Sequence, residues 1–117
     1  MLSLHEIAEA IEKECDRAQD LIDEVYKTVV KAAEAEVDFK SEFARSRITI
    51  RDDAANRGAK MTMDQVEDHA TLETVTERRA HLLASGTLTA VREAVRVSQA
   101  RLDAYRTLAA TFRNGGG

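Results

Sequence analysis

The sequence lacks proline and tryptophan, and Gly58 and Gly86 are its only glycines before the last three residues. Proline and glycine most often interrupt regular structure, so their scarcity predicts few, long elements. Aromatic residues make up only 4% of the chain, which excludes a thick aromatic core. The charged fraction of 32%, together with Ala, Glu, Arg, Leu and Val at helical periods, is typical of an all-α protein with coiled-coil character.

No apolar run approaches the roughly 18 residues that a membrane-spanning helix needs, and the first residues lack a signal-peptide pattern. The single cysteine, Cys15, has no intramolecular disulfide partner, which fits a reducing compartment. Because Cys15 lies on an apolar helical stripe, we expect a buried thiol. A chain of 117 residues predicts one domain. We therefore expect a single-domain cytoplasmic protein.

The net charge of −4 conceals alternating segments. Residues 1–39 carry 4 Lys/Arg against 11 Asp/Glu, a balance of −7, and residues 61–85 carry 2 against 5, a balance of −3. Residues 40–60 carry 6 against 3, and residues 86–117 carry 5 against 2, so each of these has a balance of +3. The negative net charge disfavours a surface that is basic throughout, but it permits a local anion-binding surface.

The first predicted helix covers about residues 4–55. Ser3 and Glu6 form a capping box at its start. Its apolar residues keep a spacing of three and four, which predicts a seam packed on another helix. The seam residues are Leu4, Ala8, Ile11, Cys15, Ala18, Ile22, Val25, Val29 and Ala32. The alternation at residues 47–51 also suits a short strand, but no second strand-like run exists to pair with it, so helix is favoured.

A turn at residues 56–61 follows, in which Gly58 can adopt positive φ at the helix C-terminus. Thr62 and Gln65 then form a second capping box. The second predicted helix covers about residues 63–113. The apolar phase changes near residues 85–87, which indicates either a break or close packing at Gly86. Residues 114–117 are expected to form a flexible tail.

The last part of the second helix carries another regular seam. A long helical hairpin that is rich in alanine buries little apolar surface per residue, so we expect the seams to drive self-association into a homo-oligomer. A different protein partner is the alternative. The predicted oligomerisation residues are Leu88, Val91, Val95, Leu102, Tyr105 and Phe112, with Ser98 and Ala109 on the same seam.

Catalytic motifs are absent from the sequence. The three histidines, His5, His69 and His81, have no metal-ligand spacing. The acidic residues next to His69 are typical of a capped helix start. No phosphate-binding loop and no nucleophile with a neighbouring base occurs. We therefore expect no enzyme activity, no cofactor and no metal site.

A basic cluster surrounds the predicted turn. One interpretation is a set of ordinary exposed charges, partly paired with Glu42, Asp52 or Asp53. The other is a phosphate-binding strip, since guanidinium groups suit bidentate phosphate contacts. With so few aromatics to stack bases, binding would be sequence-independent and sensitive to salt. The candidate DNA-binding residues are Arg45, Arg47, Arg51, Arg57 and Lys60, with Lys40 nearby.

Three segments carry a resemblance to a known family: the RSR triplet at 45–47, TMDQVEDHATLETV at 62–75 and LLASGTLTAVREAV at 82–95. Over roughly residues 37–113 the chain resembles the UvsY family of phage recombination mediators. The shared layout is a basic end of one long helix, a short glycine-containing turn, a capped acidic helix start and a Ser-Gly step before the last amphipathic helix.

The resemblance implies an oligomeric ring that binds single-stranded DNA in a phage-infected bacterial cell. It also implies a RecA-like recombinase and a single-strand-binding protein as partners, with the mediator helping the recombinase to displace the latter. The family's Lys-x-Arg pair corresponds to Arg45 and Arg47, and its self-associating C-terminal region corresponds to the seam after Gly86. The alternative function is a helical structural or adaptor protein that binds a protein partner and has no nucleic-acid role.

Overall fold

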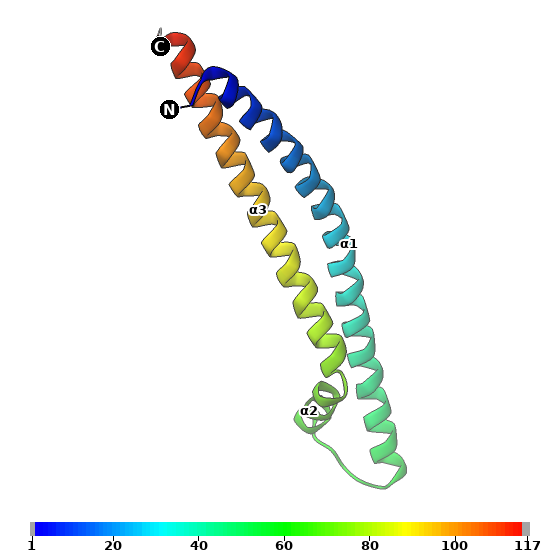
Figure 1. The fold of residues 1–117 in the computed structure, drawn as a ribbon. Helices are drawn as coiled ribbons and strands as arrows, with labels where there is room; N and C mark the ends of the chain where they lie inside the picture. The colour runs from blue at the N-terminus through cyan, green and yellow to red at the C-terminus, as the bar shows by residue number, and fades with distance from the viewer. Residues whose placement is uncertain (1, 116–117) are drawn as a thin grey trace. The chain divides into compact units, whose positions relative to one another are not determined.

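The computed structural model describes residues 2–115, and these form three helices and no strand (Figure 1). The helices are α1 (Leu4–Asn56), α2 (Met63–Glu73) and α3 (Val75–Asn114). The predicted all-α class is confirmed, and residues 47–51 are helical. Within residues 2–115, no helix is long and apolar enough to cross a membrane.

The predicted ends of α1 agree closely with the structure. At its start, the backbone amide of Glu6 donates to Ser3 Oγ over 3.1 Å. At its end, Gly58 has a φ of +67°. The amides of Gly58 and Ala59 donate to the carbonyls of Ala55 and Ala54, which is the Schellman arrangement. Glycine adopts this left-handed backbone without a steric penalty, so α1 stops here.

The capping box predicted at Thr62 is complete, since the Thr62 hydroxyl accepts from the Gln65 amide and the Gln65 side chain accepts from the Thr62 amide. At Ser3 the Glu6 carboxylate accepts from the Ser3 hydroxyl instead of the Ser3 backbone amide, so only half of the predicted box forms. The interruption of the second predicted helix is at Thr74, and α3 is continuous through Gly86. Thr74 is buried, and its hydroxyl donates to the Ala70 carbonyl over 2.7 Å. Bonds of this kind from threonine to the preceding turn often bend helices, although Thr87 makes one inside the continuous helix α3.

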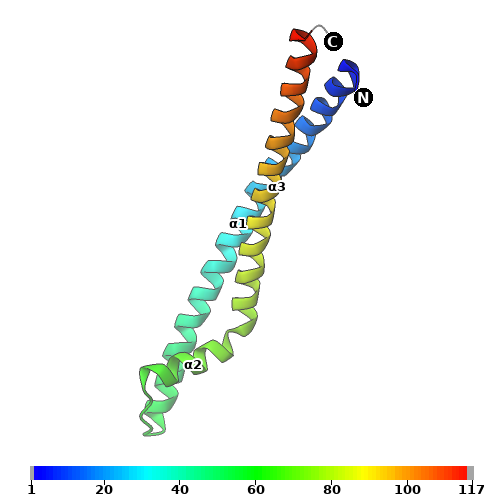
Figure 2. The ribbon, with the colours of Figure 1, turned by 90° about the vertical axis from the view of Figure 1, so that its left-hand side faces the viewer.

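The described residues divide into two compact units. Unit 1 contains the described part of Met1–Thr28 and of Leu88–Gly117, and unit 2 is Val29–Thr87. In unit 1 the first part of α1 lies beside the last part of α3 (Figure 2). Ile7, Leu102 and Ala109 are buried in this unit. In unit 2 the turn and α2 follow the end of α1, and the buried apolar residues are Ala54, Val66 and Ala70.

The predicted seam of α3 is confirmed as its inward face. Leu102, Ser98 and Ala109 are buried, and the other five seam residues are half-buried. In unit 1 this face lies against α1 of the same chain, since Val95 lines a hollow with Ile22. The role of the six predicted residues in oligomerisation therefore stays a prediction.

The predicted seam of α1 is correct at four of its nine positions, and Leu4 at its start is exposed. Ile11, Ala18, Val25 and Ala32 are half-buried as expected. Between them the inward positions are one residue earlier than predicted: Ile7, Glu14, Leu21 and Thr28 in place of Ala8, Cys15, Ile22 and Val29. Cys15 is consequently exposed, and the expectation of a buried thiol was wrong.

The shifted phase of α1 has a physical cause in two polar residues. The Glu14 carboxylate accepts from Ser98 Oγ over 2.9 Å, so it is satisfied inside unit 1. The Thr28 hydroxyl donates to carbonyls of its own helix, at 2.9 Å to Glu24 and 3.0 Å to Val25. Because both polar groups have partners, each can occupy a buried position that apolar periodicity assigns to its neighbour.

Candidate nucleic-acid interface

The two arginines of the RSR triplet lie on different sides of α1. Residues two apart in a helix are separated by about 200° around its axis and do not face each other. Arg45 is exposed and pairs with Glu42, whereas Arg47 is half-buried. The helix therefore cannot direct both guanidinium groups at one phosphate.

Arg47 is held on a ladder of aromatic rings within unit 2. Its guanidinium carbon lies 5.8 Å from the Phe43 ring centroid. The Phe43 ring lies 6.0 Å from Phe39, which stacks at 5.7 Å on His81 of α3. A cation over an aromatic face is electrostatically favourable, so the ladder fixes the direction of Arg47. The Nε atom of Arg47 is buried without a hydrogen-bond partner.

Arg51 follows Arg47 by one helical turn and so lies on the same side of α1. It is exposed, and its Nη2 atom lies 3.0 Å from Sδ of Met63 at the start of α2. Arg51 and Met63 also line an open hollow beside the turn, with Ala54, Ala55, Ala59, Met61 and Val66. This apolar support places a cationic group where α1 meets α2.

The last two candidate residues lie in the turn itself. Arg57 precedes Gly58, and its Nε atom donates to the Asp53 backbone carbonyl over 3.3 Å. Lys60 is exposed, two residues after Gly58. Both cations are thus placed at the same end of unit 2 as Arg51 by the glycine-dependent turn.

Carboxylates neutralise only part of the cluster. Arg45 pairs with Glu42, and Lys40 Nζ lies 2.7 Å from Glu36 Oε1. Between residues 2 and 115, none of the other four cations forms an ion pair: Arg47, Arg51, Arg57 and Lys60. The interpretation of paired surface charges therefore holds for Arg45 through Glu42, whereas neither the Asp52 nor the Asp53 carboxylate forms an ion pair within residues 2–115. An anion-binding surface needs cations that are not already compensated.

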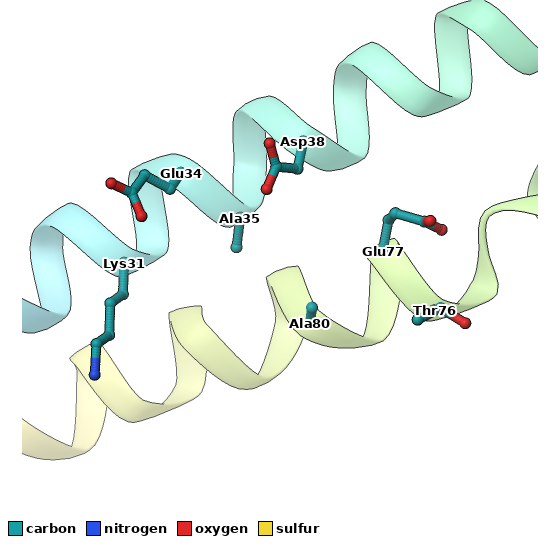
Figure 3. Close-up of a pocket in the computed structure, with 7 residues that line it drawn as sticks. All are labelled: Lys31, Glu34, Ala35, Asp38, Thr76, Glu77 and Ala80. Atoms are coloured by element: carbon teal, nitrogen blue, oxygen red, sulfur yellow. The ribbon is translucent and has the colours of Figure 1, made fainter.

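Unit 2 also contains an acidic groove between α1 and α3 (Figure 3). The lining residues are Lys31, Glu34, Ala35, Asp38, Thr76, Glu77 and Ala80. Three carboxylates against one ammonium group disfavour an anionic ligand there. Oε2 of Glu77 is buried without a hydrogen-bond partner. Over the described stretch, residues 2–115, no group of three or more His, Cys, Asp or Glu side chains could hold a metal ion.

Sequence reasoning missed the separation of Arg45 from Arg47 and the ladder under Arg47. The first follows from helical geometry once residues 45–47 are assigned to a helix. Part of the second is visible in the sequence, because Phe39, Phe43 and Arg47 are spaced four apart. The stacking of His81 on Phe39 depends on the register between α1 and α3, which no local pattern encodes.

Comparison of the chain with protein-family models, with curated proteins and with solved structures finds no match.

Proposed function

We propose that the chain binds single-stranded DNA through the basic end of unit 2 and acts as a recombination mediator for a RecA-like recombinase. The observation that carries the proposal is the pair Arg47 and Arg51, which lie one turn apart and have no acidic partner in the described residues. Arg57 and Lys60 extend the same cationic end, and Arg45 adds charge from another side of α1.

The expected contacts are to phosphates and carry no base readout. Guanidinium groups donate to phosphate in a planar fork, and the sequence contains no tryptophan to stack bases. Phe39 and Phe43 are half-buried in the ladder beneath Arg47. Binding of one copy should accordingly be weak and should strengthen when several copies are joined. The mediator role itself rests on the resemblance of residues 45–47, 62–75 and 82–95 to the UvsY family.

A titration of fluorescently labelled oligo-dT at several salt concentrations tests DNA binding. The logarithm of the association constant should fall linearly with the logarithm of salt concentration, with a slope of about 0.7 per phosphate contact on a single strand. In Arg47→Ala/Arg51→Ala, binding should weaken and the slope should become shallower. The control is Arg106→Ala/Arg113→Ala, which removes two exposed arginines of α3 that lie outside both the basic cluster and the hollow at Ile22.

Two results would refute the interface. One is the absence of binding at low salt, and the other is an equal loss of affinity in the control variant. The mediator role needs a separate measurement, namely the ATPase rate of a RecA-like recombinase on DNA coated with a single-strand-binding protein. We expect the chain to shorten the lag of that reaction and Arg47→Ala/Arg51→Ala to do so less.

The alternative, an adaptor protein without a nucleic-acid role, is favoured by a different observation. Large apolar side chains remain exposed on α2 and α3, among them Leu72, Leu82 and Leu83. An exposed contiguous apolar patch marks an interaction site more often than single exposed residues do. DNA binding that fails at every salt concentration would leave this alternative as the better account.

A further inference from the structure

An apolar groove with a cationic rim lies on the outer side of unit 2. It is lined by Thr71, Val75, Arg78, Arg79, Leu82 and Leu83. Leu82 is 60% exposed and Leu83 is 65% exposed. On α3 the neighbouring residues Glu77, His81 and Ala84 are half-buried and face inward, so the groove belongs to the opposite side of the helix. Nothing in the described residues covers these leucines.

The charges on the rim indicate what kind of surface fits the groove. Arg78 and Arg79 are exposed, and neither forms an ion pair within residues 2–115. Apolar side chains flanked by uncompensated cations suit an amphipathic helix whose apolar stripe is bordered by carboxylates. The groove therefore favours an acidic helix as its occupant.

Unit 1 presents such a face on α1. Ile22 is 39% exposed and Tyr26, one turn later, is 72% exposed. Asp16 and Asp23 are seven residues apart and border this stripe on one side, while Arg92 of α3 lies on the other. Asp23 accepts a 3.1 Å hydrogen bond from Gln19, and within the described residues no cation pairs with either aspartate. The inward positions of α1 are Leu21, Val25 and Thr28, so Ile22 and Tyr26 lie at the edge of the contact with α3 and remain exposed beside an open hollow.

We infer that the groove of one copy receives the Ile22–Tyr26 face of α1 from a second copy, with Arg78 and Arg79 opposite Asp16 and Asp23. The two surfaces differ, so the contact is heterologous, and every copy carries both halves. Contacts of this kind extend from copy to copy into a closed ring or an open chain. The inference goes beyond the proposed function, because the assembly involves no nucleic acid and uses residues outside the basic cluster.

Charge reversal on each surface tests the contact by sedimentation across a range of protein concentrations, without DNA. Arg78→Glu/Arg79→Glu places anions opposite aspartates, and Asp16→Lys/Asp23→Lys places cations opposite arginines. Each variant alone should need on the order of tenfold or more protein to self-associate. An equimolar mixture should assemble again, since both kinds of contact between the two variants are then oppositely charged.

The matched control is Glu24→Lys/Asp103→Lys, which changes the net charge equally in unit 1 but lies off the stripe. It should self-associate like the unaltered chain. Circular dichroism establishes that each variant keeps its helices. Should a charge-reversed variant unfold, Leu83→Ser and Tyr26→Ser replace it, because both side chains are exposed.

Four results would each overturn the inference. In the first, the unaltered chain is monomeric at all concentrations, and in the second, neither charge reversal weakens self-association. In the third, only the groove variant weakens self-association, and in the fourth, the equimolar mixture of the two variants does not assemble. If the unaltered chain self-associates but binds no DNA at low salt, the proposed function is refuted and the inferred contact is not.

Discussion

The Ser98 hydroxyl donates a 2.9 Å hydrogen bond to Oε2 of Glu14, although the two residues are 84 positions apart in the sequence. Ser98 is 1% exposed and Glu14 is 7% exposed. Oε1 of Glu14 also lies 3.5 Å from Nη1 of Arg101, which reaches the carboxylate from a half-exposed position. A buried polar pair thus fixes the register between α1 and α3 in unit 1.

Removal of one member of this pair should destabilise the protein more than removal of both. In Ser98→Ala the buried carboxylate loses a donor, and we expect a loss of about 1–3 kcal/mol in the free energy of unfolding. In Glu14→Leu/Ser98→Ala neither polar group remains, so much of that loss should be recovered. Urea unfolding followed by circular dichroism measures both. Equal destabilisation by the single and double variants would contradict this explanation, and exposed Thr107→Ala is the control.

The two interior glycines should respond to alanine in opposite directions. Gly58 has a φ of +67°, so Gly58→Ala should lower the free energy of unfolding by about 1 kcal/mol. Gly86 is in the interior of α3, and an added Cβ would meet nothing within 4 Å. Gly86→Ala should therefore raise the free energy of unfolding by up to about 1 kcal/mol. Thermal unfolding at low protein concentration checks both, and the same sign for the two variants would be inconsistent with these backbone assignments.

The pKa of Glu36 should lie below its ordinary value of 4.5, chiefly because Lys40 donates a hydrogen bond to the carboxylate. The charge of Lys40 and, to a smaller extent, that of His81 lower this pKa further. A depressed carboxyl pKa means that the contribution of the pair to stability is complete above about pH 4.5. It is lost as the pH falls through the lower folded-state pKa.

Carbon-detected NMR of the side-chain carboxyl group follows the titration of Glu36 directly. In Lys40→Met the pKa should return toward 4.5, whereas Lys31→Met, which removes a lysine elsewhere on α1, should leave it low. The effect on global stability should be small, since Glu36 and Lys40 are both substantially exposed. If the pKa of Glu36 were unchanged in Lys40→Met, the hydrogen bond from Lys40 would be excluded as the cause of the lowered pKa.

Cys15 should react with a thiol reagent in the folded protein. Its side chain is exposed on α1, beside the buried Glu14. At neutral pH, and at protein concentrations low enough for the chain to be monomeric, a colorimetric disulfide reagent should modify it at a rate similar to that in urea. A modification rate more than about a hundredfold lower than in urea would mean that the thiol is covered by a contact that the single chain does not provide.

Local chemistry in the sequence predicts the helix boundaries well. Ser3, Gly58 and Thr62 each act on backbone groups a few residues away, so their roles can be read from the sequence. The break at Thr74 escaped prediction because threonine is common inside helices, whereas Gly86 appeared to be the weaker position. Thr74 is buried and its hydroxyl bonds to Ala70, but buried Thr28 makes the same kind of bond inside the continuous helix α1, so no local signal marks the break at Thr74.

Contacts between residues that are distant in the sequence determine which residues of α1 face inward, and apolar periodicity alone does not predict this. On α1, Ile22 and Leu21 are both apolar, and the buried position goes to the register that gives Glu14 its donor from Ser98. The candidate DNA-binding residues show the same limit. Their positions in the chain were evident, but the support of Arg47 by Phe43 and the pairing of Arg45 with Glu42 emerge only from the helical structure.

The division into units has a consequence for how the protein forms during synthesis. Unit 2 is one continuous stretch, Val29–Thr87, whereas unit 1 joins two stretches from opposite sides of it. On the ribosome, the first 28 residues must wait until residue 88 and those beyond it have emerged. When unit 2 has already folded, the two helical segments of unit 1 start closer together, and the loop that must close between them is effectively shorter. We expect unit 2 to fold first and the two segments of unit 1 to pair afterwards.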